Sequence, residues 1–308
     1  MSPLLLAALL PLLFWDQGPE TADQLLRAGI REVAVPPSLE AAWKSKPDLA
    51  VRIVNSAEAV KLTKPGVQMR PNVASATRSP WVDTNAWKLL RAPAGRFFYE
   101  APGPAASLAA AEAHQYGAEA WISTDSAGLE PLAAMLGFLI QLKPFAGQPV
   151  ADIGFVDDGS TAAGEVINLM VRRNLLFRIV KAPDNKLRMN VPFGAGKYTR
   201  QAAANPSEMA QQIRAELTDE KRSLRIYGSE VVIARLTGDG RRLRVQLLNY
   251  AARPVNGLRV RVRGVYKNNE VRVFGLPDAA LLDFESDSQA TEFTLRQLPS
   301  YAVVDLTR

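Results

Sequence analysis

The sequence predicts an α/β domain followed by an antiparallel β-sandwich. Residues 15–222 alternate short β-rich runs with helix-like segments, which predicts a largely parallel sheet with helical crossovers. Over residues 223–308 the β-rich runs continue without helices between them, as in a sandwich. The number of strand and helix repeats favours a (β/α) barrel. Residues 15–222 fall short of the roughly 250 residues of a typical barrel, so an incomplete or irregular barrel is an open alternative.

The apolar run at the N-terminus has two interpretations. Its length suits the core of a signal peptide and is below the roughly 20 residues that cross a bilayer. Residues 1–14 are therefore predicted to be a leader, and the protein to be secreted or periplasmic with no integral membrane segment in the mature chain. No Lys or Arg precedes the run, however, and PLLFW also has the pattern of a first buried strand. Under that interpretation the protein is cytoplasmic.

Helix and strand signals recur in order along residues 15–222. The segment PETADQLLRAGI has Pro19 near its start, acids in its first turn and Gly29 at its end, as a short helix does. Further helices are predicted in TNAWKLLR, AASLAAAEAHQYG, LEPLAAMLGFLIQL, AGEVINLMVRRN and NPSEMAQQIRAEL. Strands are predicted in REVAVPP, LAVRIVN, GVQMRPN, RFFYEAP, AEAWISTD, ADIGFVDD and LLFRIVKAP.

Two later segments refine this organisation. The stretch between Lys181 and Asn205 is polar and contains glycine, so it is predicted to be a long loop. Residues 149–224 as a whole either complete the barrel or form a small, separate flavodoxin-like unit. In the C-terminal part, TGDG between two β-rich runs predicts a hairpin. Three arginines alternate with apolar residues there and are predicted to share one face of a strand: Arg259, Arg261 and Arg263.

The amino-acid composition excludes several kinds of catalytic and metal site. The chain has no cysteine, which excludes disulfides, thiolate metal sites and cysteine nucleophiles. His114 is its single histidine and lies inside a helical segment, where a role on the helix surface or in packing is expected rather than catalysis. The net charge of +6 is spread along the chain, so nucleic acid is not expected as a partner. Carboxylates are therefore the leading candidates for catalysis, and no metal or cofactor is predicted.

Polar residues at the carboxyl ends of predicted strands are the first candidate site, because parallel α/β folds build their sites there. Glu100 and Asp125 end consecutive predicted strands. Neighbouring strands lie about 4.8 Å apart, so the two carboxylates can reach the roughly 5 to 10 Å used in glycoside hydrolysis. Glu100 is predicted to be nucleophile or acid/base, with Asp125 as its partner or, alternatively, as a helix N-cap. Further strand-end candidates are Asp16, Asn55, Asn72, Asp157 and Asp158.

The segment SPWVDTNAWKLLR supplies groups that sugar recognition uses. A tryptophan ring stacks on the apolar face of a pyranose, while carboxylate and amide groups bind its hydroxyls. The residues predicted to bind sugar are Trp81, Asp83, Asn85, Asp16 and Asp157. For the carboxylates among them, helix capping is the structural alternative.

A barrel with strand-end acids, loop tryptophans and a terminal sandwich resembles the retaining barrel glycoside hydrolases. The segment RRLRVQLLNYAARPVNGLRVRVRG is similar in pattern to their C-terminal sandwich, with Asn249 and Tyr250 in the matching motif. The resemblance implies a carbohydrate-active protein with an oligosaccharide or polysaccharide as its partner. The family carries an Asn-Glu pair at one strand end, whereas Glu100 here follows Tyr99. A non-catalytic carbohydrate-binding or envelope scaffold protein is therefore the alternative to a hydrolase.

Overall fold

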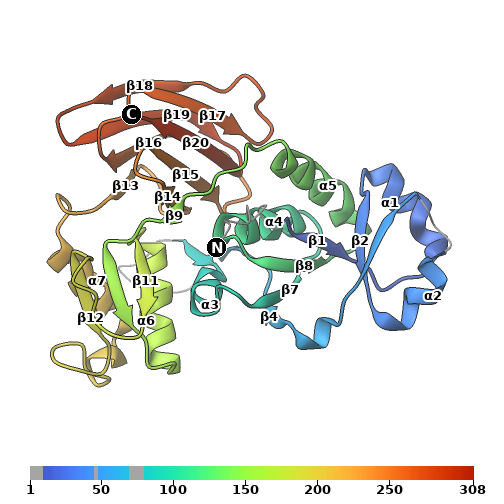
Figure 1. The fold of residues 1–308 in the computed structure, drawn as a ribbon, viewed down its shortest axis with the longest axis horizontal. Helices are drawn as coiled ribbons and strands as arrows, with labels where there is room; N and C mark the ends of the chain where they lie inside the picture. Colours follow the sequence, from blue (N-terminus) through green and yellow to red (C-terminus); the bar gives the residue numbers. More distant parts are fainter. Residues whose placement is uncertain (1–9, 45–47, 69–79) are drawn as a thin grey trace, which may run out of the picture. The chain divides into compact units, whose positions relative to one another are not determined.

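A computed structural model describes residues 10–44, 48–68 and 80–308 (Figure 1). The chain divides into two compact units. Unit 1 combines the described residues of Met1–Gly66 with Ala92–Pro144, and unit 2 combines those of Val67–Arg91 with Phe145–Arg308. Residues 1–9 of the predicted leader and the candidate Asn72 lie outside the described residues.

A parallel sheet, called here the large parallel sheet, forms the centre of unit 1. Its strands lie in the order β3 (Ala50–Ile53), β2 (Glu32–Val35), β1 (Leu12–Phe14), β8 (Glu119–Ser123), β7 (Arg96–Glu100) and β4 (Val60–Leu62). Every pairing is parallel. Apart from β5 and β6, which lie outside it, the sheet keeps the cyclic order of the chain, as a barrel does. Among the described residues, however, β3 and β4 remain its edges, so the sheet has the strand order of a barrel without closing into one.

Four α-helices accompany the large parallel sheet in the described part of unit 1. They are α1 (Ala22–Ala28), α2 (Glu40–Trp43), α4 (Ala105–Tyr116) and α5 (Ser126–Ile140). Alanine side chains make up most of the buried face of α4, which lets this helix approach both β8 and α5 closely. Gly117 ends α4 with φ of 64°, the left-handed conformation that glycine adopts without a steric penalty.

The N-terminal apolar run contributes a central strand. Residues Leu12 to Phe14 form β1, which pairs with β2 on one side and β8 on the other and is buried throughout. The interpretation of PLLFW as a first buried strand therefore describes these residues, and a leader ending at residue 14 would include this strand. No helix in the described part of the chain is long and apolar enough to span a bilayer. The cellular location stays a prediction.

A second, smaller parallel sheet lies in unit 2. It consists of β11 (Phe177–Val180), β10 (Ile153–Val156) and β12 (Met189–Pro192), accompanied by α6 (Thr161–Arg172) and α7 (Pro206–Leu217). Residues 149–224 therefore do not add strands to the large parallel sheet, and their parallel strands form a separate sheet. Strand β12 corrects the prediction of a loop between Lys181 and Asn205. Its sequence MNVP contains a proline and one fully buried residue, Val191, so pairing with β10, rather than a local pattern, makes it a strand.

The C-terminal part of unit 2 is an antiparallel sandwich. One sheet has the order β13 (Leu224–Tyr227), β16 (Val255–Arg263), β19 (Ala290–Leu298) and β18 (Leu281–Ser286). The other has the order β17 (Asn268–Val273), β20 (Tyr301–Thr307), β15 (Arg242–Asn249), β14 (Val232–Gly238) and β9 (Gln148–Pro149). Both sheets bury side chains in one shared apolar core, which includes Val245, Leu258, Phe293 and Val304. The predicted antiparallel sheets are thereby confirmed.

Local signals explain the main turns of unit 2. The segment TGDG forms the β14–β15 hairpin, where Gly240 has φ of 91° and the Asp239 carboxylate accepts the backbone N–H groups of Arg241 and Arg242. Asn205 caps α7 by accepting the N–H of Glu208, and Pro206 occupies its first turn. The remaining elements are the paired strands β5 (Gly66–Gln68) and β6 (Trp81–Asp83), and the helix α3 (Ala86–Arg91).

Candidate functional site

One face of the large parallel sheet carries a row of aromatic side chains. Phe14 on β1, Trp121 on β8 and Phe98 on β7 are buried there in one cluster. The rings of Phe14 and Phe98 meet edge to face at 5.1 Å between centroids, although β8 separates their strands. Such convergence is expected on the concave side of a curved sheet. Because side chains alternate along a strand, Glu100 follows on the same side as Phe98, at the carboxyl end of β7. Asp16 lies two residues beyond the carboxyl end of β1.

Glu100 is the last residue of β7 and points to solvent. Its side chain is 67% exposed, and its carboxylate lies 3.9 Å from the ammonium group of Lys61 on the neighbouring strand β4. An exposed pair at this separation contributes little to stability, because water screens it and both side chains lose rotamer freedom. Glu100 therefore remains a carboxylate that can accept hydrogen bonds from a ligand.

Asp125 has a structural task. Its Oδ1 accepts the N–H of Gly128 at 3.0 Å, which caps α5, and the N–H of Gly103 at 2.9 Å, which fixes the loop between β7 and α4. Gly128 is held close to that loop: an added Cβ would lie 2.8 Å from the carbonyl oxygen of Gly103. Two roles were predicted for Asp125, and its contacts are those of a helix N-cap.

Asp16 is exposed directly after β1. The residues around it are held in place by two buried indoles. Trp15 donates its Nε1–H to Thr21 at 2.8 Å, and Trp43 donates its Nε1–H to the carbonyl of Gln17 at 3.1 Å. The Asp16 carboxylate therefore lies on an ordered backbone. Asn55, after β3, caps a short turn instead, accepting the N–H of Ala57 and donating to Glu58.

A buried acid behind the sheet was not predicted as a site residue. Glu112 on α4 is fully buried, and the equally buried Tyr99 on β7 donates its hydroxyl to it at 2.9 Å. Burial, together with the nearby Glu112 carboxylate, raises the pKa of Tyr99 well above its usual value. The sequence does carry a signal for this pair, since Glu112 is the one acid inside an alanine-rich helix. His114, on the same helix, is also buried, so its position is that of a packing residue rather than of a helix-surface one.

The tryptophan cluster predicted to bind sugar lies in unit 2, on β6 and α3. Trp81 is half-buried, and the guanidinium of Arg172 covers one face of its ring at 3.2 Å from the centroid. Asp83, at the end of β6, is half-buried, whereas Asn85 is 2% exposed at the start of α3. The carbonyl of Asn85 accepts the N–H of Leu89. A sugar could reach Trp81 only on the ring face away from Arg172.

Asp157 and Asp158 follow β10 and are neutralised by arginines. Arg91 binds the Asp157 carboxylate through two hydrogen bonds of 2.8 Å, a fork geometry that is strong and oriented. Asp158 accepts the N–H of Ser160 and pairs with Arg200. Hydrogen bonds from Ser160, supported by Arg200, lower the pKa of Asp158 to about 2. Both carboxylates thus hold the loop before α6, whose N-cap is Ser160 itself.

No protein-family model matches the sequence, and no curated protein matches it either. The structure is similar to alpha-L-fucosidase isoenzyme 2 from Paenibacillus thiaminolyticus, with a TM-score of 0.52 and 9% identity, over 87% of this chain and 69% of that one. The fold is similar to that of this fucosidase. At such identity the likeness concerns the fold alone, and at that level the predicted resemblance is confirmed.

Two other solved structures are weaker matches. A maltogenic alpha-amylase from Thermotoga neapolitana aligns with a TM-score of 0.28 and 9% identity, over 98% of this chain and 99% of that one. A glycoside hydrolase family 30 subfamily 8 xylanase from Clostridium acetobutylicum aligns with a TM-score of 0.26 and 9% identity, over 97% and 96% of the two chains.

Asn249 and Tyr250, which carry the predicted resemblance of the sandwich, have a structural role here. Asn249 is buried and donates from its Nδ2 to the carbonyls of Arg253, Leu298 and Pro299 at 2.9 to 3.0 Å. The buried hydroxyl of Tyr250 lies 3.0 Å from that of Thr84. These bonds satisfy backbone groups at the end of the sandwich, so the motif reports the fold of this region rather than a ligand site.

The predicted arginine row lies on the outer face of β16. Arg259 and Arg261 both pair with Glu292 on the neighbouring strand β19, while the valines between the arginines are buried. In the described part of the chain, no cluster of three His, Asp or Glu side chains is arranged to hold a metal ion.

Proposed function

We propose that this protein binds carbohydrate through the carboxyl edge of its large parallel sheet and does not hydrolyse it. The fold similarity to a fucosidase supports the ligand class. The proposed absence of hydrolysis rests on the contacts of Asp125. Glycoside hydrolysis takes two carboxylates, one of which transfers a proton while the other attacks or activates water. Oδ1 of Asp125 is occupied by two backbone N–H groups.

The hydrogen bonds that Asp125 would lose by turning toward a ligand support a non-catalytic site. Approach of this carboxylate to a sugar carbon would release the N–H groups of Gly103 and Gly128, opening the first turn of α5 and the loop after β7. The Glu100 side chain is exposed and holds no loop in this way, and Asp16 is likewise exposed beyond the carboxyl end of β1. Two exposed carboxylates can accept sugar hydroxyls, which is sufficient for recognition without a second catalytic group.

Binding and turnover are measured on the same samples. A panel of oligosaccharides and polysaccharides is tested by affinity electrophoresis and calorimetry, and reducing-end release is followed in parallel. We expect binding without release. The Glu100→Gln variant should bind about tenfold more weakly, because a charged acceptor contributes more to a hydrogen bond than a neutral one.

The matched control is Glu119→Gln. Glu119 is also half-exposed on a strand of the large parallel sheet, but at the opposite end of the strands from Glu100. Its replacement should leave binding unchanged. The proposal fails if no member of the panel binds, or if both variants weaken binding equally.

Hydrolysis is the second candidate function, favoured by the exposure of Glu100. In that case Glu100 is the nucleophile or acid/base, with Asp125 as the predicted partner. Release of reducing ends by the native protein that disappears in both Glu100→Gln and Asp125→Asn would support it over binding alone.

A further inference from the structure

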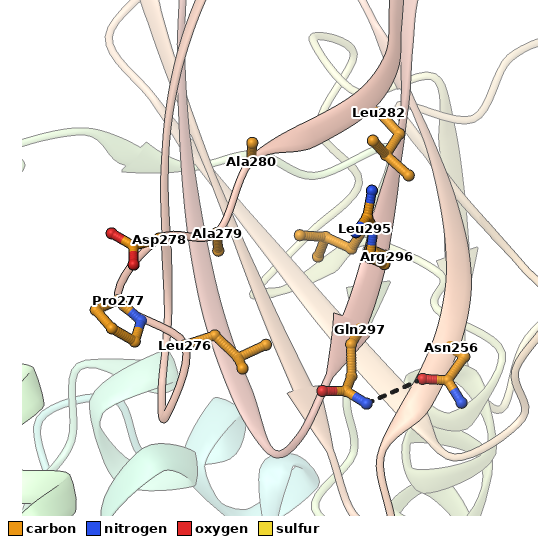
Figure 2. Close-up of a pocket in the computed structure, with 10 residues that line it drawn as sticks. All are labelled: Asn256, Leu276, Pro277, Asp278, Ala279, Ala280, Leu282, Leu295, Arg296 and Gln297. Carbon is orange, nitrogen blue, oxygen red and sulfur yellow. Dashed lines mark hydrogen bonds between the residues drawn. The ribbon is translucent and has the colours of Figure 1, made fainter.

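A hollow opens at one end of the sandwich. It has a volume of about 730 Å³, within the roughly 300 to 1,000 Å³ of small-ligand sites. The residues that line it come from the loop between β17 and β18 and from strands β16, β18 and β19 (Figure 2). The pairing of β18 with β19 shifts register between Leu282 and Glu285, and Asp283 has φ of 49°. This bulge bends β18 at the rim of the hollow.

The floor of the hollow is aliphatic. Leu276 on the loop and Leu295 on β19 extend toward each other across it (Figure 2). Leu295 is buried in the sandwich core, while Leu282 is 36% exposed. No aromatic ring lines the hollow. A ligand would therefore contact the floor with a methyl group rather than by stacking a flat ring face.

An amide pair stands beside that floor. Asn256 and Gln297 lie opposite each other on β16 and β19, and Gln297 Nε2 donates to Asn256 Oδ1 at 3.2 Å. Among the described residues, the two side chains make no other hydrogen bond. The Oε1 acceptor of Gln297 and the Nδ2 donor of Asn256 can therefore bind a ligand. The amide oxygen of Gln297 turns toward the loop that carries Leu276 (Figure 2). The hollow thus places a hydrogen-bond acceptor next to an apolar surface.

The charges around the hollow cancel. Asp278 and Arg296 are both exposed and of opposite sign, so the site favours a neutral ligand. An acetamido group matches the remaining features, because it carries an N–H donor and a methyl group on one planar unit. We propose that the hollow binds a neutral N-acetylated sugar. The acetamido N–H donates to Gln297, its methyl group contacts Leu276 and Leu282, and a ring hydroxyl accepts from Asn256.

N-acetylglucosamine and glucose are the two probes for this proposal. The full-length protein is titrated with each sugar, and saturation-transfer NMR reports which ligand protons touch the protein. We expect N-acetylglucosamine to bind at least tenfold more tightly than glucose, with the strongest saturation on its acetyl methyl protons. Two variants should reduce this binding at least tenfold: Gln297→Leu removes the acceptor, and Ala280→Trp fills the hollow from an exposed position.

Asn268→Ala is the matched control, since Asn268 is an exposed amide on β17 that does not line the hollow. It should bind N-acetylglucosamine as the native protein does. Glu100→Gln should also bind it normally, so failure of the proposed function at the sheet edge is distinguishable from failure here. Equal affinity for glucose, the absence of binding at millimolar sugar, or full binding by both Gln297→Leu and Ala280→Trp would overturn the proposal.

Discussion

At the scale of single residues, Asp125 shows how one carboxylate can serve two backbone segments. Replacing it with alanine leaves the N–H groups of Gly103 and Gly128 without this acceptor. We expect the free energy of unfolding of unit 1 to fall by about 1–2 kcal/mol, the usual cost of losing a helix N-cap. Urea denaturation followed by tryptophan fluorescence measures this. Asp16→Ala is the control, because Asp16 is exposed at the same edge of the sheet; an equal loss in both variants would contradict the capping role.

The buried pair of Tyr99 and Glu112 gives a second prediction at this scale. Tyr99→Phe removes the hydroxyl that donates to Glu112 and leaves a fully buried carboxylate with one donor fewer. We expect a loss of about 1–3 kcal/mol in the free energy of unfolding, measured by the same denaturation. The double variant Tyr99→Phe with Glu112→Gln should recover part of the loss, because a neutral amide is cheaper to bury than a carboxylate. No recovery would indicate that the hydroxyl matters only for packing.

At the scale of elements, Asn174 extends the hydrogen bonding of strand β14. Its Nδ2 donates to the carbonyl of Val232 at 2.9 Å, and its Oδ1 accepts the N–H of Ala234 at 2.8 Å. The side chain therefore acts as one rung of a ladder along the outer side of β14, which β9 continues farther along. The left-handed conformation of Asn174, with φ of 52°, is one that asparagine tolerates better than most residues.

Replacing Asn174 with alanine should expose the start of β14 to local opening. Each buried backbone group left unpaired costs about 1–3 kcal/mol. The expected result is faster hydrogen exchange at the Ala234 amide, with exchange in the middle of β15 much less affected. Asn268→Ala on β17, an exposed amide, should change neither rate. Unchanged protection of Ala234 in Asn174→Ala would mean that water replaces the side chain at no cost.

Elements with strong local signals could be predicted from the sequence, and those made by tertiary pairing could not. The alanine-rich helix ending at Gly117 and the TGDG hairpin each carry a periodic pattern and a turn residue that determine them locally. Strand β12 lacks such a pattern and exists because β10 offers it a partner. The same division holds for the site. Strand-end placement of Glu100 was visible in the pattern, whereas the amide pair of Asn256 and Gln297 forms between strands far apart in the sequence.

At the scale of the whole molecule, most of the described strand-end acids stabilise the unit in which they lie. The strand-end carboxylates of Asp125, Asp157 and Asp158 hold loops and helix starts, while Glu100 and Asp16 remain exposed. A fold can therefore keep the order of barrel strands and the position of their acids while the acids serve stability. This is the physical reason why a fold resemblance alone does not give the activity.

The same carboxylates predict how stability depends on pH. Several acids have pKa values lowered in the folded chain by hydrogen bonds from backbone and side-chain donors and by nearby Arg or Lys side chains: Asp158, Asp184, Glu216, Asp219, Glu220, Asp239 and Asp287. A lowered folded pKa contributes stability that is present above the unfolded pKa, about 4, and is lost as the pH falls through the folded value. The melting temperature should therefore fall steeply between about pH 4 and pH 2.

The tyrosines determine how the stability of the folded chain changes at high pH. Burial raises the pKa of Tyr99, Tyr198, Tyr266 and Tyr301 above the usual value. A raised folded pKa contributes stability that is present below the unfolded pKa, about 10, and is lost as the pH rises above it. We thus expect a plateau from about pH 5 to pH 9 with a decline on both sides, measured by thermal melting. Asp158→Asn should make the acid limb shallower, because the amide that replaces this carboxylate does not titrate as the pH falls; a native melting temperature that stays constant from pH 5 to pH 2.5 would contradict this account of the ion pairs.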